Sequence, residues 1–184
     1  MIIRDEALQL LKRHLKNENL LKHSFAVEAI LKEMANILKK DEELWGLTGL
    51  LHDLDYEYTK QNPEKHAITT AEILEELLPT EAINAIKAHN YQQTMQIPQT
   101  SLDKALISAD AVSGLIIAAA LVMPSKKLAD VKTTTIHKKY KDKSFASGCN
   151  RKRIDLCEDV GLNLDIFLNL SLNAIKKISG QLDL

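Results

Sequence analysis

Apolar residues along this chain recur mostly three and four positions apart, which is the spacing of one face of an α-helix. The clearest stripe begins near Asn19, a suitable N-cap, and ends before the basic pair Lys39 and Lys40. We therefore expect one long amphipathic helix here, with a histidine on its apolar face. Its inward positions are Leu20, His23, Val27, Ile30 and Met34.

The same spacing predicts a succession of further helices. Pro63 is a suitable first-turn residue for one of them, and Pro79 separates that helix from the next. Gly161 and Gly180 lie where C-terminal stops are expected. The predicted helical segments are 45–53, 63–77, 81–89, 102–123 with Ser101 as its cap, and roughly 125–140, 150–160 and 164–179.

Composition agrees with an all-α fold in one domain. The chain has 6 glycines, 4 prolines and 4% aromatic residues, too few for an all-β domain with frequent tight turns. Its 184 residues suffice for one hydrophobic core, so we expect a single domain over 1–184. Two cysteines and a charged start with no signal-like stretch favour a cytoplasmic protein.

The segment 111–123 contains no charged residue, but it is too short to cross a membrane. A bilayer core needs about 20 consecutive apolar residues, and Lys104 and Asp110 precede this segment by a few positions. We expect a buried central helix and no membrane partner.

The formal charge of −1 hides a strong polarity along the chain. Between Lys126 and Arg153 there are ten basic and two acidic side chains, a net charge of +8. This segment is either a solvated face or a surface that attracts an anionic substrate. Only Tyr140 and Phe145 offer rings for base stacking there, which disfavours nucleic acid. Association with a second copy of the chain stays open, because helical domains of this size often form dimers.

Four histidines and two aspartates fall on inward positions of different predicted helices. A lone histidine on an apolar face is usually a satisfied core residue, and Asp110 alone is explained equally well by a buried hydrogen bond. Six such donors together are harder to explain by packing. Nitrogen and oxygen donors without a thiolate suit Mn, Fe, Zn, Co or Ni, and six are enough for two ions that share a carboxylate. The candidates are His23, His52, Asp53, His66, His89 and Asp110.

The order of these residues resembles the HD-domain superfamily of metal-dependent phosphohydrolases. The local sequences that carry the resemblance are Leu-Lys-His-Ser, Leu-Leu-His-Asp-Leu-Asp, His-Ala-Ile-Thr-Thr-Ala-Glu-Ile-Leu and Ile-Ser-Ala-Asp-Ala. They span roughly residues 20–120, with the basic helical extension following at 125–184. The resemblance implies an all-helical bundle with the metal site at its centre.

The resemblance also implies a set of metal ligands. The first ion would be held by His23, His52, Asp53 and Asp110. His66 and His89 match the additional ligands of members with two ions, in which Asp53 bridges, or they contact substrate in a one-metal member. The ions would be Fe, Mn, Ni, Co or Zn, with Mg as a further candidate. The sequence Leu54-Asp55-Tyr56 after the His-Asp pair differs from the HD-GYP branch, which disfavours a cyclic dinucleotide phosphodiesterase of that branch.

The working hypothesis is hydrolysis of a phosphoester of a small anionic substrate, such as a small nucleotide. Asp53 would take part at the metal centre, and Asp55 and Glu57 follow closely enough to orient the water or protonate the leaving oxygen, or else form a solvated loop. The stretch before residue 151 offers small residues and hydroxyls for a phosphate cradle. Its candidate substrate-binding residues are Lys143, Ser144, Asn150 and Arg151.

Two other functions stay open at this stage. An HD-type di-iron oxygenase has a similar six-ligand order, and metal content with O2 consumption would separate it from a hydrolase. A catalytically silent, nucleotide-binding regulatory HD module would keep the bundle without turnover, although such modules usually lose ligands and all six positions are filled here.

Overall fold

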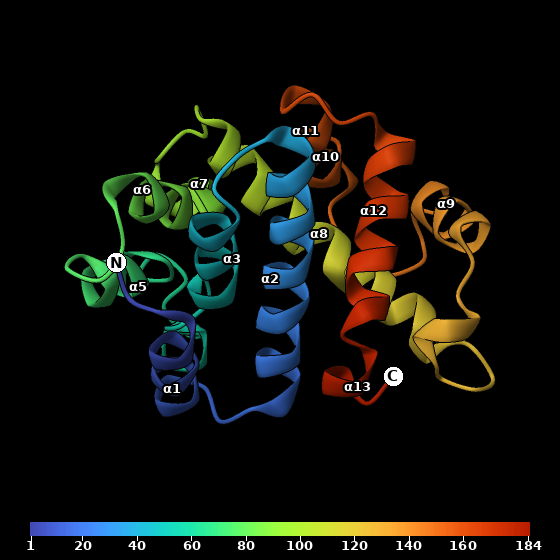
Figure 1. Ribbon diagram of the computed structural model, residues 1–184, viewed down its shortest axis with the longest axis horizontal. Coiled ribbons are helices and arrows are strands. Elements are labelled where there is room, and N and C mark those ends of the chain that lie inside the picture. Colours follow the sequence, from blue (N-terminus) through green and yellow to red (C-terminus); the bar gives the residue numbers. More distant parts are fainter.

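The computed structural model describes residues 1–184 and is entirely helical, which confirms the all-α prediction (Figure 1). It contains thirteen α-helices, one 3-10 helix and no strand. In chain order these are α1 Arg4–His14, α2 Glu18–Leu38, α3 Glu42–Leu51, α4 Tyr56–Thr59, α5 Ile68–Leu74, α6 Thr80–His89, α7 Tyr91–Thr94, α8 Ser101–Leu121, η1 Leu128–Asp130, α9 Thr133–Lys141, α10 Arg151–Ile154, α11 Leu156–Asp159, α12 Leu164–Lys177 and α13 Ser179–Leu182.

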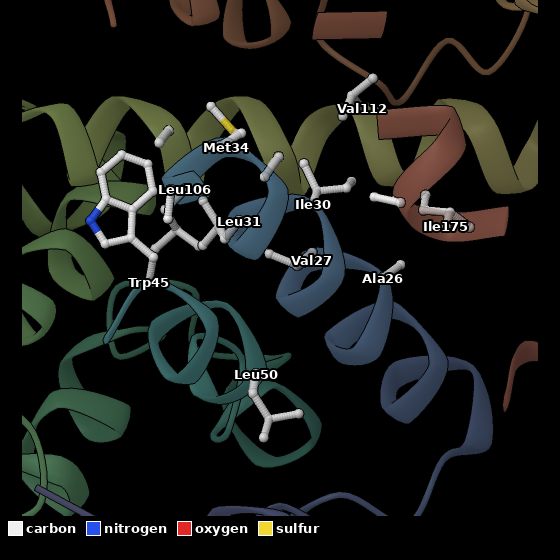
Figure 2. Packing of buried hydrophobic residues seen from close by; sticks show 14 of the residues in the cluster. Ala26, Val27, Ile30, Leu31, Met34, Trp45, Leu50, Leu106, Val112 and Ile175 are labelled. Atoms are coloured by element: carbon white, nitrogen blue, oxygen red, sulfur yellow. The ribbon is translucent and has the colours of Figure 1, made fainter. Parts of the chain in front are cut away.

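The two longest helices form the centre of the molecule. Figure 1 shows α2 running through the middle, with α1 and α3 on one side, α12 on the other and α8 crossing behind. A single cluster of 45 buried apolar residues joins these helices. Figure 2 shows part of it, with Leu31 and Met34 of α2, Trp45 of α3 and Leu106 of α8. Burial of this apolar surface is the main source of stability for the fold.

Two predicted helix caps are wrong by one or two positions. Asn17, not Asn19, caps α2, because its side chain accepts a hydrogen bond from the backbone N–H of Asn19. Thr100, not Ser101, caps α8 in a reciprocal arrangement with Asp103. In each case the residue with extended backbone angles precedes the first helical turn, and apolar spacing alone does not locate it.

The helix predicted from Pro63 begins only at Ile68, where α5 starts. Residues 63–67 form turns, and Ala67 has a left-handed backbone with φ 73°. The carboxylate of Asp55 explains this start, since it accepts hydrogen bonds from the N–H groups of Ala67 and Thr70. A distant side chain therefore sets the beginning of α5 in place of a local cap.

The C-terminal part is more broken than the apolar spacing predicts. The segment 125–140 contains η1 and α9, 150–160 divides into α10 and α11, and 164–179 into α12 and the start of α13. Gly161 has φ 89° after α11, as expected for a stop, whereas Gly180 lies inside α13. Helices α1, α4 and α7 were not predicted; α1 is held by Ala7 and Leu11 in the core.

Helix α8 is long and apolar enough to pass for a membrane span by length and composition alone. Of its most apolar 18-residue window, 67% is buried inside the fold. Its apolarity is therefore accounted for by its contacts with α2, α6 and α12, and gives no evidence of membrane association.

Helices α2 and α3 approach closely at Gly49. A Cβ atom at this position would lie 3.0 Å from the backbone of Val27 and Glu28 and 3.0 Å from the side chain of Leu31. The close approach matters for the site, because α2 carries His23 and α3 leads directly into His52.

Replacing Gly49 by Ala should force α3 away from α2 and lower the free energy of unfolding by about 1–3 kcal/mol. Urea denaturation followed by circular dichroism measures this difference. Gly180→Ala is the matched control, because a Cβ there meets no atom within 4 Å. Equal midpoints for the two variants would contradict the close-approach account.

Candidate metal centre

The six candidate ligands come from five separate parts of the chain. His23 lies on α2, and His52 and Asp53 follow the end of α3. His66 precedes α5, His89 is the last residue of α6, and Asp110 lies at the middle of α8. The packing of these helices around the core brings all six side chains to one place.

The Asp53 carboxylate lies at the centre of the group. Its Oδ1 is 3.4 Å from Nε2 of His52, 3.4 Å from Nε2 of His66 and 3.3 Å from Nε2 of His89. Its Oδ2 is 3.7 Å from Nε2 of His23. Four imidazole rings thus present the same nitrogen to one carboxylate.

The opposite nitrogen of every ring is held by another group. Nδ1 of His52 lies 2.9 Å from the carbonyl oxygen of Gly49, and Nδ1 of His89 contacts that of Ile86. Nδ1 of His66 is 2.8 Å from the carboxylate of Asp55. Because only acceptors face these atoms, each Nδ1 carries a proton and donates it.

Nδ1 of His23 is also held by an acceptor, which in this case is a hydroxyl oxygen. The Ser113 hydroxyl donates to the carbonyl oxygen of Asp110, which leaves its oxygen free to accept from Nδ1 of His23 at 3.0 Å. All four rings are therefore oriented with Nε2 toward Asp53. Fixing the tautomer through the other ring nitrogen is typical of histidine metal ligands.

Two features show that this geometry suits a cation at the Nε2 atoms. Nε2 of His52 is buried and has no hydrogen-bond partner, and burial lowers the pKa of His52 to about 4, so the ring is neutral at pH 7. Nε2 of His66 lies 3.1 Å from Nε2 of His89. Two lone pairs this close repel each other unless a proton or metal ion lies with them.

The donors divide into two groups that share Asp53. One consists of His23, His52 and Asp53, and the other of Asp53, His66 and His89, with the ligand atoms of each within 4.8 Å of one another. Two nitrogens bound to one ion are about 3.0–3.4 Å apart at ordinary bond lengths, which fits the His66–His89 separation. The residues present fit one or two divalent first-row metal ions.

Asp110 lies at the edge of this cluster. Its Oδ1 is 3.3 Å from Nε2 of His23, and its Oδ2 accepts a 2.9 Å hydrogen bond from Arg153. Burial by itself would raise the pKa of the Asp110 carboxyl, but the hydrogen bond and charge of His23, with Arg153, lower it below its usual range. Asp110 is thus ionised and available to a cation bound at His23.

The remaining charges of the cluster also favour a bound cation. Burial opposes ionisation of Asp53, yet the surrounding His52, His89 and His23 hold its pKa well below the ordinary value. Burial likewise opposes protonation of His66, but the hydrogen bond to Asp55 outweighs it and raises the pKa of His66. The pKa of His23 is raised in the same way by Asp110. The cluster attracts positive charge, whether a proton or a metal ion.

The structure gives Asp55 a different role from the predicted catalytic one. This side chain is fully buried, and its oxygens are taken by His66 and by the N–H groups of Ala67 and Thr70. It is a positioning residue that orients one imidazole and starts α5. Neither of its oxygens faces a space where substrate would bind.

Glu57 lies away from the candidate metal ligands. Its carboxylate accepts hydrogen bonds from the backbone N–H groups of Lys16 and Asn17, directly before α2. It therefore holds the start of α2, and it does not line the cavity around the cluster.

The predicted phosphate cradle is mostly structural. All three guanidinium nitrogens of Arg151 donate to backbone carbonyls, so this side chain has no donor left for substrate. Ser144 donates to Asp142, and Lys143 is exposed and outside the cavities near the cluster. Only Asn150, whose side-chain oxygen accepts from the N–H of Lys152, lines a cavity beside the cluster.

Sequence reasoning missed two residues that complete the site. Arg153 donates from Nη2 to Asp110 and to the carbonyl oxygen of His89, and it lines the cavity of the cluster. Arg153 is one of ten basic residues between positions 126 and 153, and no neighbouring sequence feature distinguishes it from the others. Ser113 had a usable signal, because a hydroxyl three residues after Asp110 lies on the same helical face.

Comparison with known proteins agrees with this centre. The family model described as "HD domain" matches residues 20–115, which include all six candidate ligands. Curated relatives include ribonuclease Y from Clostridium perfringens strains SM101 and 13, each 29% identical over 180 residues. These matches cover 90% of this chain and 33% of the relative, so the chain spans about a third of the length of the relatives it matches. No solved structure matches.

Replacing Asp55 by Asn should destabilise the fold and lower the metal content. Asn retains one acceptor and adds a donor, which would face His66 or the N–H groups at the start of α5. Loss of one such charge-assisted bond costs about 1.5–3 kcal/mol. We expect a lower unfolding midpoint and reduced metal per chain by mass spectrometry.

Glu57→Gln is the matched control for Asp55→Asn. It also removes a carboxylate, but one that contacts no candidate metal ligand, so the variant should keep the wild-type metal content. An Asp55→Asn protein with unchanged stability and unchanged metal content would refute the positioning role.

Proposed function

The chain belongs to the HD-domain family, and from that premise we propose that it is a metal-dependent phosphohydrolase that cleaves a phosphoester with an activated water. The observation that carries the proposal is the Asp53 carboxylate with four Nε2 atoms turned toward it. His23, His52 and Asp53 would hold one divalent ion, and Asp53, His66 and His89 would hold a second.

Bound divalent ions would supply Lewis acidity, acidifying a water molecule and neutralising charge on the phosphoryl oxygens. The protein contributes the orientation of the donors. Neutral His52 is fixed by Gly49, and His66 by Asp55, so their nitrogens need no reorientation when the site is filled. In hydrolysis the water oxygen bonds to phosphorus, the ester P–O bond breaks, and the leaving oxygen gains a proton.

Arg153 is placed to bind the phosphoryl group. Its guanidinium lies against Asp110 and lines the cluster cavity of about 350 Å³. A fixed guanidinium beside the reacting centre binds the negative charge that the phosphoryl oxygens carry throughout the reaction. This residue replaces Arg151 in the proposed site.

The proposed substrate is a small anionic phosphoester, a class that includes nucleotides and sugar phosphates. The net charge of +8 over residues 126–153 supports an anionic ligand. The name ribonuclease Y of the relatives favours a second candidate, a phosphodiester in RNA. Substrate panels therefore need both monoesters and diesters.

Turnover should depend strictly on the metal. Treatment with a chelator is expected to abolish release of phosphate from p-nitrophenyl phosphate or cleavage of bis(p-nitrophenyl) phosphate, and Mn²⁺ or Co²⁺ should restore it. Asp53→Asn should lose the activity even with added metal. No hydrolysis of either ester by fully loaded protein, or consumption of O2 by an iron-loaded one, would contradict the proposal.

Arg153→Gln should raise KM for a phosphoester more than it lowers kcat, because the side chain binds the phosphoryl group before and during reaction. Loss of a charge-assisted hydrogen bond corresponds to a rise of about ten- to a hundredfold. Arg153→Lys should recover part of the loss. Lys152→Gln, an exposed neighbour, is the control, and an equal effect of both neutral variants would indicate general surface charge instead.

A further inference from the structure

A second cavity adjoins the one around the metal ligands. It has a volume of about 410 Å³, within the usual range of small-molecule sites. Three residues line both cavities, namely His23, Asp110 and Arg153. A molecule whose phosphoryl group lies between Arg153 and the cluster would therefore extend the rest of its structure into the second cavity.

The lining of the second cavity is polar, and it contains no Phe, Tyr or Trp; its one ring is the imidazole of His23. Besides the three shared residues, it consists of the amide side chains of Gln92 and Asn150, three small residues and Cys149. The small residues are Ala111, Gly114 and Gly148. Tyr56 lines the cluster's own cavity, and its ring meets that of His66 edge-on at 5.3 Å.

Arg151 holds one wall of this cavity in place. Its guanidinium donates to the carbonyl oxygens of Ala146 and Cys149, and across to that of Lys139 in α9. The backbone around Gly148 and Asn150 is thereby tied to a helix. A site whose wall is fixed before binding loses less entropy when a ligand enters.

We propose that this second cavity binds the sugar or polyol part of a phosphomonoester, so that the substrate is a sugar phosphate without a nucleobase. Amide groups both donate and accept, which suits hydroxyl groups that do the same. Stacking is a main source of affinity for bases, and the cavity offers no Phe, Tyr or Trp ring for it. Its one ring, the imidazole of His23, has its Nε2 turned toward Asp53 and Asp110. The inference rests on the phosphohydrolase function proposed above and specifies its substrate.

The test compares D-ribose 5-phosphate with AMP, which is the same sugar phosphate bearing adenine. With metal-loaded protein, kcat/KM for phosphate release should be at least about tenfold higher for ribose 5-phosphate. Equal or better use of AMP would overturn the inference while leaving the phosphohydrolase function intact. Failure to hydrolyse p-nitrophenyl phosphate as well would instead count against the phosphohydrolase function.

A pair of adjacent variants tests the cavity itself. Gln92→Ala should weaken binding of ribose 5-phosphate about threefold or more by calorimetry on chelator-treated protein, because one hydrogen-bonding group is lost. Gln93→Ala should leave it unchanged, since Gln93 does not line the cavity. The calorimetric comparison does not depend on turnover. Equal affinity of wild type and Gln92→Ala for ribose 5-phosphate would overturn the inference.

Discussion

The structure depends on a buried carboxylate that is surrounded by four imidazole rings of fixed tautomer. An isolated charge on Asp53 would be costly to bury. Here it is compensated by the imidazole of the adjacent His52 and by three imidazoles from other parts of the chain. Nδ1 of each ring forms a hydrogen bond with a further group, which is Ser113, Gly49, Asp55 or Ile86. The close approach of α2 and α3 at Gly49 and the start of α5 at Asp55 are parts of this one arrangement.

The helical content and the six inward donors could be predicted because both follow from the spacing of apolar residues along the sequence. Apolar periodicity indicated α2, α3, α6, α8 and α12, and it placed His23 and Asp110 on inward faces. The caps at Asn17 and Thr100 and the late start of α5 could not be read in the same way. They depend on which side chain reaches a free N–H group, and for α5 that side chain is twelve residues away.

The basic segment shows most clearly where sequence reasoning stops. Arg151 and Arg153 are two residues apart and identical in chemistry, yet one holds a loop through backbone carbonyls and the other contacts a candidate metal ligand. Charge counting treats them alike. Of the two residues that complete the site, Ser113 lies inside the matched HD segment and Arg153 lies outside it. The C-terminal helices therefore contribute to the centre as well as to the core.

We propose that Asp53 is shared by two groups of histidines that would each hold a metal ion. Anomalous X-ray diffraction from crystals of the metal-loaded protein, recorded at the absorption edge of the bound metal, tests it most directly. Two anomalous peaks are expected, one against His23 and His52 and the other against His66 and His89, with Asp53 in contact with both. No peak at this cluster, or ions bound only elsewhere on the molecule, would contradict it.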